Sequence, residues 1–143
     1  MSSMQDRLRV HPEIRFAPRQ DVFDLNAVAE SLMREPNAGQ HGHRQEALFR
    51  DGSTTLALYC FEPGSFLADH IVDGPVIIHV LSGRVTVTTE EETYELGAGM
   101  LIRLAAGVRH DVAALESSQM LLTIFVAGPR SHTFDVTGRD TPP

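Results

Sequence analysis

Short runs of alternating apolar and polar residues fill the chain from residue 46 to residue 126, and turn-forming residues separate the runs. A period of two is typical of strands that bury one face. The predicted strands are residues 46–50, 54–61, 65–71, 75–81, 83–89, 92–96, 100–104, 109–115 and 118–126. Many short strands at regular spacing indicate a sandwich or a jelly roll. The expected fold class is therefore all-β.

A helical pattern precedes these strands. The apolar positions at helical spacing are Leu25, Val28, Ala29 and Leu32. Asp24 is suited to the N-cap of this helix and Pro36 to its stop. We expect one short amphipathic helix.

The chain divides into three segments by pattern. Residues 11–23 carry two prolines between apolar residues, which favours an extended arm. We expect an N-terminal arm and short helix over residues 1–44, a β-barrel over 45–126 and a polar tail over 127–143.

Composition and charge exclude several classes of function. The chain has 143 residues, enough for one domain, and its net charge of −7 disfavours nucleic acid as a partner. All its basic residues are arginine, so lysine-based Schiff-base chemistry is excluded. The single Cys60 indicates a reducing compartment, and no apolar stretch approaches the ~20 residues that span a bilayer. We expect a cytoplasmic protein without a membrane partner.

Two glycine-framed stretches carry a family resemblance. The stretches GSFLADHIVDGPVIIHVLSG, from Gly64 to Gly83, and YELGAGMLIRLAAGVRH, with Gly99 and Gly107, resemble the two motifs of the cupin family. The resemblance covers roughly residues 45 to 126. It implies a single-domain cupin, whose fold is a jelly-roll β-barrel.

The metal ligands of the family are present only in part. His70 and His110 fall on two histidine positions of the motifs, whereas Val72 and Val76 stand where the motif has its other histidine and its glutamate. A catalytic zinc keeps about three protein ligands, and non-haem iron uses two histidines and a carboxylate. Two readings stay open: a pair of pocket histidines, or a weakly bound divalent metal on His70 and His110. No other cofactor is expected.

Nearby polar residues do not complete the metal site by strand alternation. Asp69 and Asp111 adjoin the two histidines and are expected to face away unless a bulge intervenes, and His79 is expected to face outward. The loop pair His41 and His43 supplies only two donors. The facing of Arg103 is open: it either holds an anionic ligand or lies on the outer face.

Two classes of function therefore remain. With valines in the ligand positions, the expected pocket is His70, Val72, Val76, Ile78 and His110, which suits a small, partly apolar ligand and a sensor or accessory role. The alternative, which the resemblance implies, is a metal-dependent dioxygenase or isomerase acting on a small organic substrate. The resemblance and the outward apolar residues of 75–81 also predict a homodimer.

Overall fold

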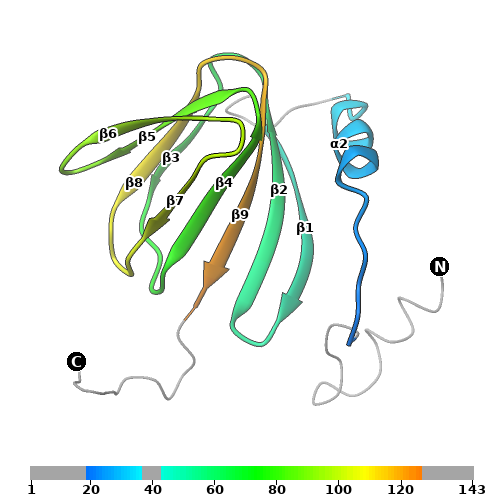
Figure 1. The fold of residues 1–143 in the computed structure, drawn as a ribbon, viewed down its shortest axis with the longest axis horizontal. Coiled ribbons are helices and arrows are strands. Elements are labelled where there is room, and N and C mark those ends of the chain that lie inside the picture. The colour runs from blue at the N-terminus through cyan, green and yellow to red at the C-terminus, as the bar shows by residue number, and fades with distance from the viewer. Residues whose placement is uncertain (1–18, 37–42, 127–143) are drawn as a thin grey trace.

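The structure, a computed structural model, describes residues 19–36 and 43–126 and consists there of two antiparallel sheets and one helix (Figure 1). The strands are β1 (His43–Asp51), β2 (Thr54–Phe61), β3 (Phe66–His70), β4 (Val76–Ser82), β5 (Arg84–Thr89), β6 (Thr93–Gly97), β7 (Leu101–Leu104), β8 (His110–Ala114) and β9 (Ser118–Phe125). The five-stranded sheet has the order β1-β2-β9-β4-β7, and the four-stranded sheet has the order β3-β8-β5-β6. The expected all-β fold is confirmed.

The core lies between the two sheets, and β4, β5, β8 and β9 alternate buried residues that face it with less buried residues on the outer faces. On β4, Val76, Ile78 and Val80 are 2%, 0% and 0% exposed, whereas the intervening residues are partly buried on the other face. Val85 and Val87 of β5 and Val112 of β8 face them from the four-stranded sheet, also at 0% exposure. His79 falls on the outer face of β4, as its parity predicts.

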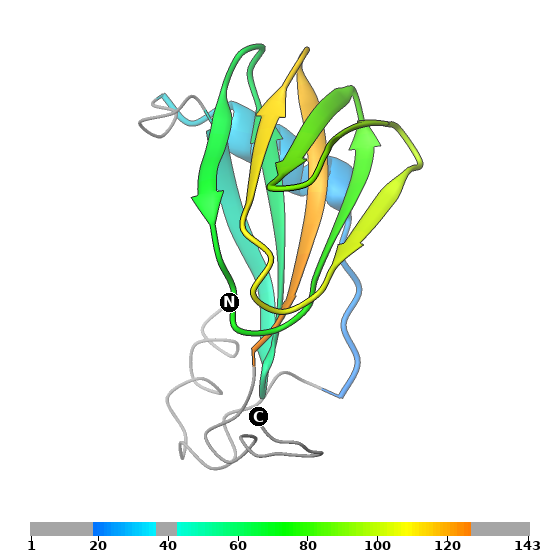
Figure 2. The same cartoon turned by 90° about the vertical axis from the view of Figure 1, so that its left-hand side faces the viewer.

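The predicted helix is present as α2 (Leu25–Met33) and covers the β1–β2 part of the outer face of the five-stranded sheet. The Asp24 carboxylate accepts a hydrogen bond from the Ala27 N–H at 3.1 Å, which is the predicted N-cap. Ala29 and Leu32 are buried against Leu58 and Cys60, which point outward from β2. Figure 2 shows α2 crossing the strands on the side away from the four-stranded sheet.

The first strand begins earlier than the sequence predicts. β1 begins at His43, so this histidine belongs to a strand and not to the predicted loop. Its ring lies against Tyr59 and Phe61, with centroid separations of 5.6 and 5.7 Å, and its Nδ1–H donates to the Phe66 carbonyl at 3.1 Å. Pairing with these aromatic residues, which alternation cannot reveal, draws His43 into the interior. His41, most of the N-terminal arm and the tail over 127–143 lie outside the described residues.

The four glycines of the motif frame all have positive φ, between 81° and 86°. This left-handed conformation strains any residue with a side chain, which explains why glycine occupies these turns. Gly83 is under a second constraint, because a Cβ there would overlap Ser118 Oγ and the Ser117 carbonyl oxygen. At Gly99 a Cβ would meet open space.

The anchoring of α2 depends on Leu32, which is 1% exposed. Leu32→Ala is expected to lower the free energy of unfolding by about 3 kcal/mol, because it leaves a cavity between helix and sheet. Met33→Ala is the matched control, since Met33 is 42% exposed, and is expected to cost less than about 0.5 kcal/mol. Urea denaturation followed by circular dichroism measures both, and equal losses would contradict this packing.

Substitutions at Gly83 and Gly99 distinguish the cost of backbone strain from the cost of steric overlap. Gly99→Ala is expected to cost about 1 kcal/mol, because only the positive φ opposes it. Gly83→Ala is expected to cost about 3 kcal/mol or more, because the new methyl group also displaces the Ser117–Ser118 turn. Thermal unfolding of the two variants gives the comparison. A smaller loss at Gly83 than at Gly99 would refute the close contact.

Candidate functional site

The two motif histidines stand directly opposite each other in the β3–β8 ladder. His70 is the Cα partner of His110, although Leu67 pairs with Val112. Three steps along β3 thus match two steps along β8, which places a bulge between Leu67 and His70. In a regular ladder Asp69 would stand opposite His110. The bulge therefore selects the histidine for this position.

His110 is a buried polar residue at the start of β8, with 4% exposure. Its Nδ1 lies 3.0 Å from the Val108 carbonyl oxygen, so the tautomer protonated at Nδ1 donates to this carbonyl. Nε2 is then the basic ring nitrogen. Asp111, the next residue, is exposed, as the strand parity predicts.

The apolar members of the predicted pocket are packed into the core. Val76 and Ile78 belong to the buried cluster between the sheets, and Val72 packs against that cluster from beyond the end of β3. The Gly107 N–H donates to the Val72 carbonyl at 2.9 Å, which ties the two motifs together. The strand β3 ends at His70, so Val72 lies in the segment that follows it.

These residues do not fit a complete catalytic metal centre. The hydrocarbon side chains of Val72 and Val76 offer no donor atom, which leaves His70 and His110 of the motif set. Among the side chains that the structure describes, no group of three or more histidine, cysteine, aspartate or glutamate residues is placed to hold a metal ion.

A small pocket of about 110 Å³ adjoins His110. It is lined by Thr88, Thr89, Glu90, Arg109, His110 and Asp111. Arg109 Nε lies 3.9 Å from Glu90 Oε2, so the two charges at its rim are partly matched. The pocket is smaller than the ~300 Å³ at which drug-sized ligand sites begin, so it accommodates at most a polar group of a larger molecule.

A larger groove of about 320 Å³ lies between β6 and β7, the adjoining edge strands of the two sheets. Its apolar lining includes Tyr94, Leu96, Ile102, Leu104 and Val108. Its polar lining is Thr89, Glu91 and Arg103. Thr89 also lines the pocket beside His110, so the two spaces share a wall.

The facing of Arg103, left open by the sequence, follows from its strand. Ile102 and Leu104 turn inward, whereas Arg103 is exposed on the outer side of β7. Because β7 is an edge strand, an outward side chain can still border the groove, and Arg103 does so. The sequence marks Arg103 as a charge within an apolar strand. It does not reveal that β6, the edge strand of the other sheet, lies beside β7.

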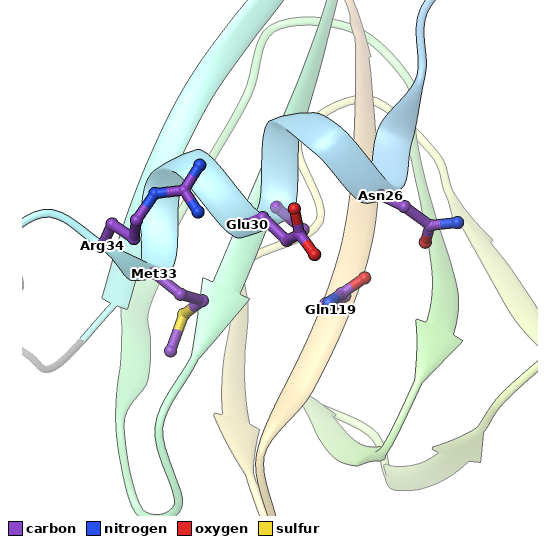
Figure 3. Close-up of a pocket in the computed structure, with 6 residues that line it drawn as sticks. Asn26, Glu30, Met33, Arg34 and Gln119 are labelled. Atoms are coloured by element: carbon purple, nitrogen blue, oxygen red, sulfur yellow. The ribbon is translucent and has the colours of Figure 1, made fainter.

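A third hollow, of about 610 Å³, lies on the outer face beside α2. Its lining comes from Asn26, Ala29, Glu30, Met33, Arg34 and Gln119. Figure 3 shows Glu30 of α2 and Gln119 of β9 pointing toward one another across it. Val72, Val76, Ile78 and His110 of the predicted site do not line this hollow.

Two buried acidic groups next to these elements have raised pKa values. Burial raises the pKa of the Tyr59 phenol inside the sandwich. Burial also raises the pKa of the Cys60 thiol beneath α2, and the positive charge of Arg44 offsets part of that rise. The thiol therefore stays protonated and shielded, as expected for a structural cysteine.

Comparison with known families agrees with the fold and the glycine frame. The family profile for the cupin domain matches residues 57–126. The chain belongs to the cupin family and is a small single-domain cupin. No curated protein matches the sequence.

Solved structures share the fold at low sequence identity. A conserved protein of unknown function from Streptococcus pyogenes is 24% identical with a TM-score of 0.60, covering 78% of this chain and 92% of that one. An RmlC-like cupin from Shewanella frigidimarina is 15% identical with a TM-score of 0.63, covering 80% of this chain and 96% of that one.

One structural neighbour is a named enzyme. A G106A mutant of salicylate 1,2-dioxygenase from Pseudoaminobacter salicylatoxidans is 16% identical with a TM-score of 0.65, covering 84% of this chain and 41% of that one. At such identities the likeness shows the fold alone. Within residues 19–36 and 43–126, no helix has the length and apolar character needed to cross a membrane.

Proposed function

We propose that this cupin binds a small, partly apolar organic molecule and serves as a sensor or accessory protein. The observation that carries the proposal is the groove of about 320 Å³ between β6 and β7. Its volume lies within the range of roughly 300–1,000 Å³ that small-molecule sites occupy, and it combines apolar walls with few polar groups. The lone free Cys60 agrees with a cytoplasmic location.

The residues predicted from the motifs have distinct places in this proposal. Val76 and Ile78 back the site as part of the core, with Val72 against them. His110, which is paired in register with His70, lines the smaller pocket. Thr89 separates this pocket from the groove, because it lines both. A ligand in the groove thus lies one residue away from the histidine pocket.

A metal-dependent enzyme is the second candidate function. The register pairing of His70 with His110 favours it, because that pairing brings two imidazole-bearing residues to adjacent strands. The likeness in fold to a salicylate dioxygenase agrees with an oxygen-dependent reaction of this class. Two protein ligands require oxygen atoms from substrate or water to complete a coordination shell, so such a metal would be weakly held.

Metal content separates the two candidates. Tag-free protein is expected to carry well below one metal ion per chain by elemental analysis, unchanged in His70→Ala and His110→Ala, because Val72 and Val76 provide no ligands. His79→Ala is the matched control, since His79 lies on the outer face of β4. About one metal per chain that is lost in both motif variants and retained in the control would favour the enzyme candidate instead.

We also propose that two copies of the chain pair through the outer face of the five-stranded sheet. The helix α2 buries Leu58 and Cys60 of β2 on this face, whereas Leu48, Leu81 and Leu121 beside them are only partly buried. Ile77 and His79 of β4 lie on the same outer face and are only partly buried. Covering these side chains removes apolar surface from water.

Light scattering tests this pairing. The expected mass is twice 15.7 kDa, and Ile77→Glu is expected to shift it toward 15.7 kDa by placing a charge in the interface. Thr88→Glu is the control, because Thr88 is exposed on the outer face of the other sheet. A wild-type mass near 15.7 kDa would reject the homodimer.

A further inference from the structure

We propose that the groove between β6 and β7 selects a small organic monocarboxylate with a flat apolar body, and that Arg103 binds its carboxylate. The inference rests on the proposed function and gives the ligand a chemical class. It goes beyond the motif histidines, since His110 does not line this groove.

The apolar body of the ligand is matched by the floor of the groove. Ile102 of β7 is partly buried and packs against the core, as do Tyr94 of β6 and Val108. These side chains end where the two sheets stop, so their outer surfaces face the groove instead of another strand. A flat ring or short chain covers such surfaces well, and the Tyr94 ring adds an aromatic contact.

The carboxylate is matched by Arg103. Arg84 and Arg109 on neighbouring elements are paired with Glu95 and Glu90. Arg103 has no ion pair or hydrogen bond with the residues that the structure describes. Its planar guanidinium presents parallel N–H donors, which fit the two oxygens of one carboxylate.

The Glu91 side of the groove favours a ligand with a single negative charge. Glu91 lies at the β5–β6 turn, exposed, and lines the same groove without an ion pair to Arg103. Its backbone N–H is satisfied by Thr89 Oγ1 at 3.2 Å, so the turn holds this residue in place. A second anionic group on the ligand would face the Glu91 carboxylate, in a protein whose net charge is already −7. Dicarboxylates and phosphates are thereby disfavoured.

The test compares benzoate with benzamide, a neutral molecule of nearly the same shape, by ¹H–¹⁵N chemical-shift titration of the full chain. Benzoate is expected to shift the amides of Tyr94, Ile102 and Arg103 in a saturable way and to bind about ten-fold more tightly than benzamide. Arg103→Gln is expected to reduce benzoate to within about two-fold of benzamide. Arg50→Gln, an exposed arginine on β1, is the matched control and leaves both affinities unchanged.

The remaining outcomes separate this inference from the proposed function. Equal binding of both probes in the groove, insensitive to Arg103→Gln, overturns the carboxylate but supports a small-molecule site. Shifts centred on Thr88 and His110 overturn the groove as the carboxylate site and move ligand binding to the histidine pocket. Absence of saturable shifts with either probe overturns the groove as a ligand site, and the proposed function loses the observation that carries it.

Discussion

The interior between the sheets sets the position of every candidate residue. Val76, Ile78 and Val80 project from β4 of one sheet into the same layer as Val85, Val87 and Val112 of the other, and all are excluded from water. Since a shift by one residue would expose this whole set, the burial of apolar surface fixes the register of the strands. His110 enters the same layer two residues before Val112, which explains why a polar side chain is buried there.

This packing also accounts for the incomplete metal site. The cupin motif places metal-binding side chains at these positions of the barrel. In this chain Val72 and Val76 occupy them and extend the apolar core. Replacing Val76 with the glutamate of the motif would bury a carboxylate among hydrocarbons, which is costly without a paired charge. At these two motif positions the side chains therefore serve the packing of the core.

Sequence alone reached most of the fold but only part of the site. Alternation and glycine spacing gave the strands, and Asp24 with Leu32 gave the helix, because these signals are local. The bulge before His70 and the entry of His43 into β1 depend on pairing partners distant in sequence, such as Val112 and Phe61. The groove depends on sheet order, since β6 and β7 become adjoining edges only in the folded chain. Arg103 could be singled out from the sequence, but its position at the border of the groove could not.

The two sides of the sandwich are closed unequally. On one side, the hydrogen bond of 3.1 Å from His43 to the Phe66 carbonyl joins β1 to β3 across the sheets. On the other, β6 and β7 border an open groove. The two sheets are thus joined by a hydrogen bond at the His43 side and leave a groove at the side of Tyr94 and Ile102. The partly buried Tyr94 and Ile102 therefore border the open groove, so a ligand can reach these core-packed side chains without any strand of the sandwich separating.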